Sequence, residues 1–385
     1  MIRSTIARVD LAALRHNFAA IQQYLQREPG TKPPGIIAVV KANAYGHGAE
    51  RVALALEQAG ATMLACADIE EGIVLRRAGV RVPVLVFGAL SVSDLDGLFE
   101  YSLTPTISTP GAARAVHAAA AKRRSPIGYH LKIDTGMNRL GFRHENLRWT
   151  LPEVLASDHL RLEGVFTHFA SADEAESPVF NTQRERFDAA FDVVSGFSRT
   201  ASPPDGGRAV VKHAANSAAM LRDSRVWYDA VRPGLLLYGI VPPPLASTLP
   251  LQPVMSLTSR VVAVKGVRPG EGVGYGWRYE ADAPRTIAVV PAGYADGLDT
   301  RLSGRGQVLI RGIRAPIVGA VSMDMITVDV TDVSEVAPGD EVVILGRQGD
   351  ESWQQIDARE VAAAIGTIPW EIVCRLGTRI ERHYD

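Results

Sequence analysis

Short apolar runs alternate with stretches of helical period along the first 240 residues. Runs rich in β-branched residues are typical of buried strands, whereas apolar residues spaced three or four apart indicate amphipathic helices. Asp10 and Thr109 each precede a helical stretch as N-cap residues, and Pro110 follows Thr109 in the first turn. The predicted strands are 36–40, 63–67, 83–87, 104–108, 129–133, 164–167, 209–212 and 229–231, and the helical stretches include 11–25, 49–56, 68–77, 91–99 and 180–194.

The repetition of this strand–helix unit predicts the fold of the first part of the chain. Eight β–α units within roughly 230 residues match the size of a (β/α)8 barrel. A doubly wound open sheet is the alternative, but it needs no eighth strand and favours a Gly-rich turn after its first strand. We therefore predict an α/β protein in which residues 1–240 form an N-terminal (β/α)8 TIM-like barrel.

The pattern changes at residues 241–253, which are dense in proline and can neither continue a helix nor form a central strand. This segment is predicted to be a linker. Beyond it, one helix is expected at 357–365, where Asp357 and Glu360 have the spacing of a capping box. We predict a C-terminal mostly-β domain over 241–385, with residues 1–9 open to pairing with it. Its strands are predicted at 260–265, 286–291, 306–311, 315–321, 327–330 and 341–345.

The composition excludes several classes of protein. The chain has 385 residues, 46% hydrophobic and 22% charged, as expected for a globular protein of one large or two ordinary domains. A net charge of -1 gives no support to nucleic acid or an anionic membrane as a partner. Two cysteines without a CxxC pair fit a reducing compartment. No signal peptide, membrane-spanning run or metal site is recognised, so we expect a cytoplasmic location.

Polar side chains follow five of the eight predicted barrel strands, where functional groups of such barrels gather. Lys41 ends an apolar run before a Gly-rich turn, and a lysine held there can form a Schiff base with an aldehyde cofactor. Phosphate sites in barrels often use the loops after strands seven and eight, which here offer the Ser217 hydroxyl and the backbone at Gly234. The strand-end residues are Lys41, Tyr45, Lys132, Asp134, Arg139, His168, His213, Asn216, Ser217, Arg232 and Gly234.

Several short sequence motifs occur along the chain. Residues 38–48 read AVVKANAYGHG, residues 132–141 read KIDTGMNRLG and residues 232–234 read RPG. GYG at 274–276, GYADG at 293–297 and SMD at 322–324 follow in the second domain. Together they resemble the motifs of alanine racemases, the fold-type III pyridoxal-phosphate enzymes, and the resemblance covers essentially the whole chain.

The resemblance implies pyridoxal-phosphate-dependent interconversion of L-alanine and D-alanine, which would supply D-alanine for peptidoglycan or serve alanine catabolism. It also implies a homodimer with shared active sites, in which Tyr275 and Met323 act on the partner's barrel. Lys132 stands where family members often have a carbamylated lysine that buttresses Arg139. The roles implied are catalytic for Lys41 and Tyr275, substrate-binding for Arg139 and Met323, cofactor-binding for Lys41, Tyr45, His168, Asn216, Ser217, Arg232, Gly234 and Leu235, and supporting for Lys132, His213, Asp324 and Tyr294.

Two of these residues bear on the type of reaction. Arg232 would face the ring nitrogen of the cofactor and stay charged without giving it a proton, which favours simple α-proton exchange over transamination. His213 is placed to orient Arg232. Racemisation needs a base on each face of the α-carbon. Lys41 can serve one face, and Tyr275, in a Gly-rich loop, is the candidate for the other if a nearby positive group lowers its pKa.

One departure from the family leaves the substrate range open. Thr378 stands where many members have a tyrosine that touches the phosphate and narrows the substrate entrance. A racemase for larger amino acids, such as serine or basic ones, is therefore an alternative. A decarboxylase of the same fold type would need a cysteine motif that the chain lacks. A non-enzymatic pyridoxal-phosphate homeostasis protein would lack residues 254–385.

Overall fold

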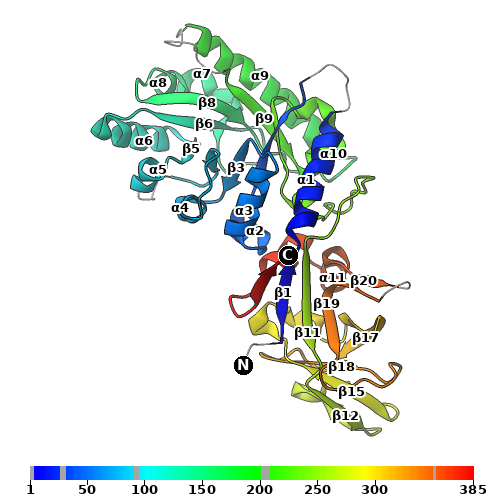
Figure 1. Ribbon diagram of the computed structural model, residues 1–385. Helices are drawn as coiled ribbons and strands as arrows, with labels where there is room; N and C mark the ends of the chain where they lie inside the picture. The colour runs from blue at the N-terminus through cyan, green and yellow to red at the C-terminus, as the bar shows by residue number, and fades with distance from the viewer. Residues whose placement is uncertain (1–3, 27–31, 91–94, 201–208, 350–352) are drawn as a thin grey trace.

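The computed structural model describes residues 4–26, 32–90, 95–200, 209–349 and 353–385, arranged as two lobes that meet at a narrow waist (Figure 1). In the upper lobe, parallel strands pair in the ring order β2–β3–β4–β5–β6–β8–β9–β10 and back to β2, which closes the barrel. The strands are β2 (Gly35–Val39), β3 (Met63–Cys66), β4 (Val84–Val86), β5 (Thr104–Ile107), β6 (Ile127–Asp134), β8 (Leu160–Phe166), β9 (Val211–Asn216) and β10 (Ala230–Arg232), with short β7 (Phe142–Arg143) beside β6.

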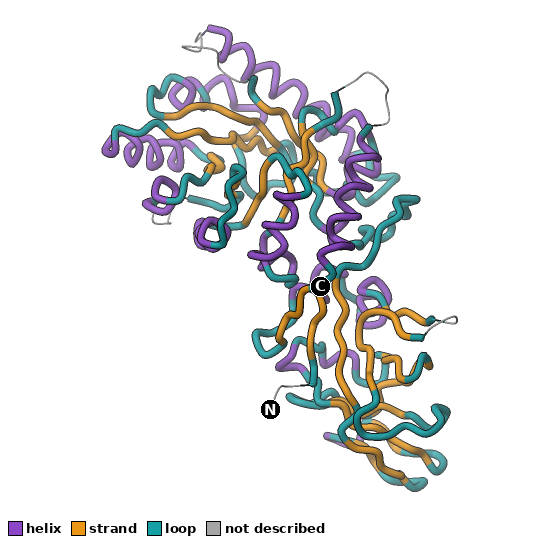
Figure 2. Tube along the Cα trace, viewed as in Figure 1, coloured by secondary structure: helices purple, strands orange, loops and turns teal. Residues whose placement is uncertain are grey.

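Helices surround the barrel strands (Figure 2), and the N-caps expected from the sequence are present. The Asp10 side chain accepts a hydrogen bond from Ala13 N, and Thr109 accepts one from Ala112 N. Residues 91–94 of the helix expected at 91–99 lie outside the described residues. The helices of this lobe are α1 (Leu11–Leu25), α2 (Lys41–Tyr45), α3 (Ala49–Gln58), α4 (Ile69–Arg77), α5 (Asp96–Glu100), α6 (Pro110–Arg123), α7 (Leu147–Thr150), α8 (Pro152–Leu155), α9 (Val179–Thr200) and α10 (Ser217–Arg222).

The lower lobe is a mostly antiparallel sheet in the order β12-β15-β18-β17-β16-β19-β11-β1-β21, with β20 beside β19 and a separate β13–β14 hairpin. The first strand of the chain, β1, pairs with both β11 and β21. The strands are β1 (Ile6–Val9), β11 (Met255–Arg260), β12 (Ala263–Val267), β13 (Gly272–Val273), β14 (Tyr279–Glu280), β15 (Arg285–Val290), β16 (Gln307–Ile310), β17 (Ile313–Val318), β18 (Ile326–Asp329), β19 (Glu341–Gln348), β20 (Gln354–Ile356) and β21 (Glu381–Tyr384).

The closed eight-strand barrel and the mostly-β second lobe were both predicted correctly, but two local predictions fail. The strand expected at 260–265 is interrupted, because β11 pairs with β19 whereas β12 pairs with β15. The late helix is α11 (Ala358–Ile365), capped by Asp357, and α12 (Pro369–Cys374) follows it. The Glu360 carboxylate binds Arg314 instead of completing the capping box. No helix within the described ranges combines the length and apolar character needed to cross a bilayer.

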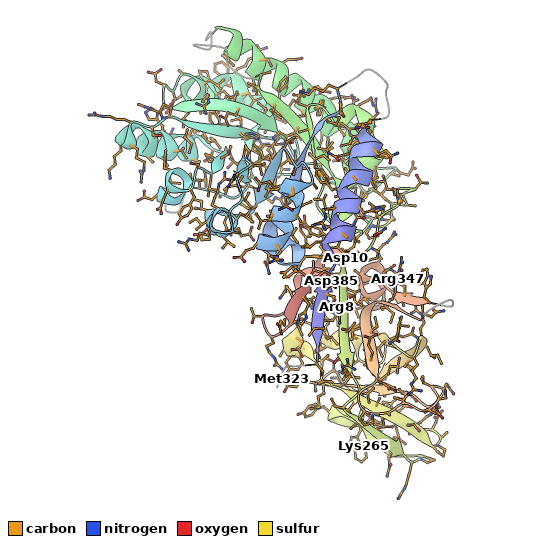
Figure 3. All side chains as sticks on the ribbon, viewed as in Figure 1. Arg8, Asp10, Lys265, Met323, Arg347 and Asp385 are labelled. Carbon is orange, nitrogen blue, oxygen red and sulfur yellow. The ribbon has the colours of Figure 1, made fainter. Side chains whose placement is uncertain are left out.

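The waist is formed by close backbone packing between the turn after β2 and the C-terminal elements. A Cβ placed on Gly46 would lie 2.1 Å from the Val373 carbonyl oxygen of α12. Arg382 of β21 donates to the Gly46 carbonyl at 2.6 Å. Asp10, Asp385 and Arg8 follow one another downward through the waist (Figure 3), where Leu11 N donates to the Asp385 carbonyl. The second lobe is therefore held directly against the turn that begins with Lys41.

The packing at Gly46 can be tested against a glycine of the same backbone conformation. Gly46 has φ +81° and Gly270 has φ +83°, but a Cβ on Gly270 would meet nothing within 4 Å. Gly270→Ala should lower the free energy of unfolding by about 1 kcal/mol, the cost of left-handed backbone alone. Gly46→Ala should lower it by about 3 kcal/mol or more, because overpacking adds to that strain. Urea unfolding followed by circular dichroism compares them, and equal losses would contradict the account.

Candidate active site

The candidate side chains from the barrel gather at one mouth, since parallel strands share the side on which their C-terminal ends lie. Lys41 follows β2, Lys132 stands near the end of β6, and Arg232 ends β10. The charges of Lys41, Arg139 and Arg232 all act on Lys132, and those of Lys132 and Arg139 act on His168. The structure therefore brings together residues that are far apart in the sequence.

Lys41 begins α2, which is a turn of left-handed backbone and not a right-handed helix. Ala42, Asn43, Ala44 and Tyr45 have φ between 52° and 54°, a left-handed conformation that costs L-residues about 1–2 kcal/mol each. Within the turn, Ala44 N donates to the Val40 carbonyl and Gly46 N to the Ala42 carbonyl, at 2.8 and 2.9 Å. Such backbone persists only where the surroundings over-determine it, and here it directs Lys41 into the mouth.

Glu71 holds the start of the turn and was missed by the sequence analysis. Its carboxylate accepts hydrogen bonds from Ala42 N at 2.6 Å and from Ala67 N at 2.8 Å. It therefore ties the Lys41 turn to the end of β3. The sequence contains a signal, because Asp68 and Glu71 have N-cap spacing at the start of α4, where Asp68 accepts from Glu71 N.

Tyr45 and the turns after β9 and β10 form a cradle for an anion. A Cβ on Gly234 would lie 2.4 Å from the Tyr45 hydroxyl oxygen, so only glycine leaves the hydroxyl in place. Ser217 Oγ accepts from Gly234 N at 3.0 Å and from Leu236 N at 3.4 Å. The predicted phosphate residues Tyr45, Ser217, Gly234 and Leu235 thus lie on neighbouring turns. The Asn216 side chain is engaged as the N-cap of α10.

Arg232 is fixed by three hydrogen bonds although it is buried. Its guanidinium donates to His213 Nδ1 at 2.8 Å and to the carbonyls of Thr167 and Ala214 at 2.7 and 2.8 Å. The structure confirms the expected contact between His213 and Arg232. Burial lowers the pKa of Arg232 to about 9, which leaves the guanidinium charged at neutral pH. Within the described residues no carboxylate pairs with it.

The contact with Arg232 fixes the tautomer of His213 and links it to a second histidine, His130. Arginine can only donate, so His213 Nδ1 accepts and its Nε2 carries the proton. His213 Nε2 therefore donates to His130 Nδ1, 2.9 Å away, which gives a chain of hydrogen bonds from Arg232 through His213 to His130. Burial and the Arg232 charge lower the pKa of His130 to about 3. His130 was not identified by the sequence analysis. The sequence does contain a signal for it, because His130, Lys132 and Asp134 are two residues apart along β6 and therefore lie on the same face of the strand.

The mouth carries more positive than negative charge. Burial and the neighbouring Arg139 lower the pKa of Lys132 to about 8, and the same two causes lower the pKa of Lys41. Burial, followed by Arg232, holds the pKa of His168 well below its usual range. Asp134 accepts from Gly136 N and Asn138 N and so shapes the loop that leads to Arg139. The mouth is therefore suited to anionic ligands.

The predicted residues of the second lobe lie elsewhere. Tyr275 is 77% exposed and Met323 51% exposed, and Met323 is far from the barrel in Figure 3. Two hydrogen bonds, from Tyr294 N to the Ser322 carbonyl and from Ala295 N to the Met323 carbonyl, join the two loops of this region. Asp324 pairs with Arg379 at 2.6 Å. Within the described ranges, no hydrogen bond or ion pair joins Tyr275 to Lys41 of the same chain, and Tyr275 is open to solvent.

Comparisons with known proteins agree along the whole chain. The family described as alanine racemase, N-terminal domain, matches residues 9–242, and that described as alanine racemase, C-terminal domain, matches residues 254–384. The alanine racemase of Carboxydothermus hydrogenoformans is 42% identical over 388 residues, with all of both chains covered. That of Halothermothrix orenii is 40% identical over 383 residues, covering 99% of this chain and 97% of its own.

Solved structures show the same likeness in three dimensions. The alanine racemase from the D-cycloserine-producing Streptomyces lavendulae superposes with a TM-score of 0.90 at 34% identity, covering 100% of this chain and 98% of its own. That of Bacillus anthracis, solved with bound L-Ala-P, gives 0.86 at 36% identity, with 100% and 96% covered. The match of the second lobe as well as the barrel excludes a barrel-only protein.

Proposed function

The chain belongs to the alanine racemase family and is an isomerase that interconverts L- and D-alanine; from this premise we propose that it works as a pyridoxal-phosphate-dependent homodimer with Lys41 and Tyr275 as its two bases. The observation that best supports this proposal is that Lys41, the buried Arg232 and the anion cradle lie at one mouth of the barrel. The anion cradle is the group formed by Tyr45, Ser217, Gly234 and Leu235.

The donor set at the mouth fits pyridoxal phosphate. The hydroxyls of Tyr45 and Ser217 and the backbone at Gly234 and Leu235 would hold the phosphate, because they converge where a Cβ would fill the space. Lys41 would hold the aldehyde carbon covalently. When bound, the cofactor supplies an electron-withdrawing ring that stabilises negative charge at the substrate α-carbon.

Arg232 would control what happens to the α-proton. Its guanidinium is charged, carries only donors and is held on three sides by His213 and two carbonyls. Placed against the ring nitrogen, it would keep that nitrogen unprotonated, which limits how far charge moves away from the α-carbon. A proton would then be returned to the α-carbon, from either face, and not to the cofactor, so racemisation would be favoured over transamination.

The two faces of the substrate would be served by different subunits. A proton on one face would be exchanged by Lys41 Nζ, whose lowered pKa increases the fraction of free amine. Tyr275, exposed on the second lobe, would serve the other face in the barrel mouth of the partner subunit. The high exposure of both Tyr275 and Met323 supports this arrangement, since a base must meet the substrate.

Arg139 and Met323 would bind the substrate carboxylate. Among the described residues, Arg139 makes no hydrogen bond or ion pair, and its charge already bears on Lys41 and Lys132. A carboxylate beside Arg139 would relieve the repulsion between these cations. The backbone of Met323, carried by the partner, would complete the contact, with Tyr294 and Asp324 shaping its loop.

The first test concerns the cofactor-bearing lysine. Borohydride reduction of the loaded enzyme, followed by peptide mass mapping, should place the cofactor on Lys41, because only this lysine stands on the left-handed turn beside the cradle. Lys132 is the internal comparison, since it lies in the same mouth with a lowered pKa. A label on Lys132 or on any other lysine would overturn the assignment.

The second test concerns reaction specificity. Arg232→Glu should slow racemisation by about 10²-fold or more, the size expected for one electrostatic group, and should produce pyruvate from alanine as a transamination by-product. Racemisation is followed by chiral chromatography and pyruvate by a coupled assay, and melting temperatures check that the variant is folded. Unchanged racemisation without pyruvate would refute the role given to Arg232.

The third test separates the two faces. Tyr275→Phe keeps the ring but removes the hydroxyl, so solvent deuterium exchange at the α-carbon should fall by about 10²–10⁴-fold from L-alanine and persist from D-alanine. Proton NMR in deuterium oxide measures both. The control is Tyr279→Phe, whose hydroxyl faces Asp329 at 3.4 Å and which should exchange normally from both enantiomers. Equal loss from both enantiomers would remove the face assignment.

Mixed dimers test whether Tyr275 acts across subunits. Lys41→Ala and Tyr275→Phe subunits, each inactive alone, should together rebuild one intact site per mixed dimer. Activity recovered in a mixed dimer verified by affinity tags is the expected result. A verified mixed dimer without recovered activity would place both bases in one subunit.

A further inference from the structure

His47 belongs to the lysine-containing string, but the proposed chemistry gives it no task. It lies two residues after Tyr45 and is completely buried, with 0% of its surface exposed. It lines the wall of the junction between the lobes, together with Tyr238 and Val373. A buried imidazole is costly unless its polar atoms are used, so its contacts indicate what it does.

The contacts of His47 fix its tautomer. Nδ1 lies 3.0 Å from the Ala44 carbonyl and 2.9 Å from the Tyr45 carbonyl. Carbonyls only accept, so Nδ1 carries the hydrogen and shares it between them. Nε2 is left as a bare acceptor without a partner in the described part of the chain. Burial lowers the pKa of His47 to about 4, which keeps the ring neutral at physiological pH.

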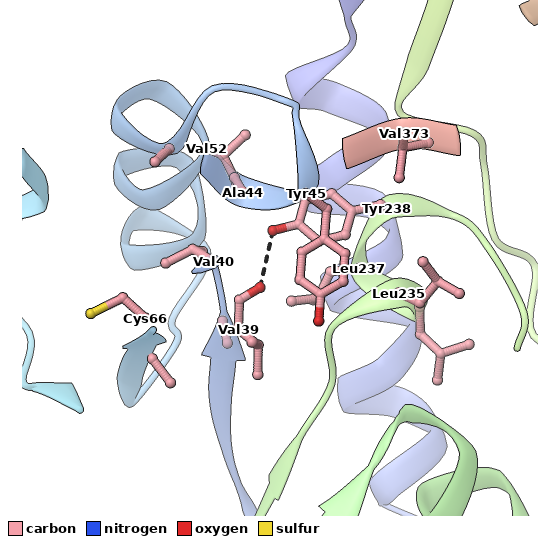
Figure 4. Packing of buried hydrophobic residues seen from close by; sticks show 14 of the residues in the cluster. Val39, Val40, Ala44, Tyr45, Val52, Cys66, Leu235, Leu237, Tyr238 and Val373 are labelled. Atoms are coloured by element: carbon pink, nitrogen blue, oxygen red, sulfur yellow. Dashed lines mark hydrogen bonds between the residues drawn. The ribbon is translucent and has the colours of Figure 1, made fainter. Parts of the chain in front are cut away.

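The His47 ring is also connected to the backbone before Lys41. It stacks on Tyr238 with ring centroids 4.4 Å apart, and Tyr238 in turn packs on the Tyr45 ring at 5.0 Å. The Tyr238 hydroxyl donates to the Val39 carbonyl at 3.0 Å, the bond drawn in Figure 4. Tyr238 therefore binds the backbone before Lys41, at Val39, and His47 binds the backbone after it, at the last two carbonyls of the left-handed turn.

We propose that His47 is a positioning residue: its Nδ1–H closes the left-handed turn and thereby sets the Tyr45 hydroxyl against Gly234 and Ser217, where it would bind the cofactor phosphate. The inference rests on the proposed function. It goes beyond that function because it assigns an effect on phosphate affinity to a buried side chain whose hydrogen bonds, among the described residues, go to the backbone of the turn. An apolar ring could fill the same space without an unpaired Nε2, so what the histidine adds at this position is its Nδ1–H, which binds two carbonyls.

Two substitutions of His47 separate its hydrogen bond from its bulk. In His47→Asn the amide nitrogen falls near the position of Nδ1 and can donate to the same carbonyls, whereas His47→Gln carries its amide one atom further, near Nε2. Loss of one net hydrogen bond corresponds to a factor of about 2–10 in an equilibrium constant. The Gln variant should therefore raise the Kd of the apoenzyme for pyridoxal phosphate by about tenfold, while the Asn variant stays within about threefold of the parent.

Pyridoxal, which lacks the phosphate, distinguishes positioning from a general loss of structure. Its Kd, measured by fluorescence quenching like that of pyridoxal phosphate, should change by less than about twofold in both variants, because His47 holds the Tyr45 end of the turn. The end that carries Lys41 is held separately by Glu71 through Ala42 N. Adding Tyr45→Phe to His47→Gln should weaken phosphate binding little further, since both changes remove the same contact. Equal effects of Asn and Gln, or equal losses for the two ligands, would show that His47 only packs the junction.

The parent enzyme provides an independent measurement. Nitrogen-15 NMR of the histidine rings should show His47 as the Nδ1–H tautomer, and an Nε2–H tautomer would overturn the proposal without any variant. If the parent apoenzyme binds pyridoxal phosphate but the Gln variant binds it equally well, only the inference about His47 is wrong. If the parent does not bind pyridoxal phosphate, the proposed function itself is wrong.

Discussion

Left-handed backbone after β2 is the constraint on which both the barrel mouth and the waist depend. Four consecutive residues without glycine adopt it, so the conformation must be imposed by its surroundings. Glu71 binds the first amide of the turn from the barrel side, and His47 binds its last carbonyls. On the other side, Val373 and Arg382 of the second lobe pack against Gly46. Anything that loosens the second lobe therefore also loosens the turn that carries Lys41.

Charge is the second organising feature. Lys41, Lys132, Arg139 and Arg232 share one mouth, and the nearest carboxylates, Glu71 and Asp134, are occupied with backbone amides. The histidines around Arg232 are neutral, because burial and its charge disfavour a second cation. The repulsion that remains is relieved when a lysine amine loses its proton or when an anionic group enters. The same field therefore favours anionic ligands and lowers the pKa of the lysine amines.

Features set by local sequence were predictable, and features set by tertiary contacts were not. All eight barrel strands and the caps of Asp10 and Thr109 follow from period and local chemistry, as does the convergence of Lys41, Ser217 and Arg232 at one mouth. The left-handed turn could not be predicted from the sequence, because residues 42–44 have no local preference for it. It depends on contacts with Glu71 and with the second lobe. The break between β11 and β12 depends on which distant strands they meet. His130 acts only through His213, so no motif pointed to it.

The pairing of β1 determines when the second lobe can be completed during synthesis. β1 leaves the ribosome first, but its neighbours are β11, which follows the barrel, and β21, which ends at Tyr384. In topological terms the barrel is an insertion between β1 and the rest of its sheet, and Asp10 N bound to the Val254 carbonyl marks where the inserted chain leaves and returns. Loop-closure entropy grows only slowly with length, so such a long insertion is tolerated. A fragment cut at the linker would contain β11 and β21 without the strand that joins them, so the linker is not a point at which the molecule divides into two independent units.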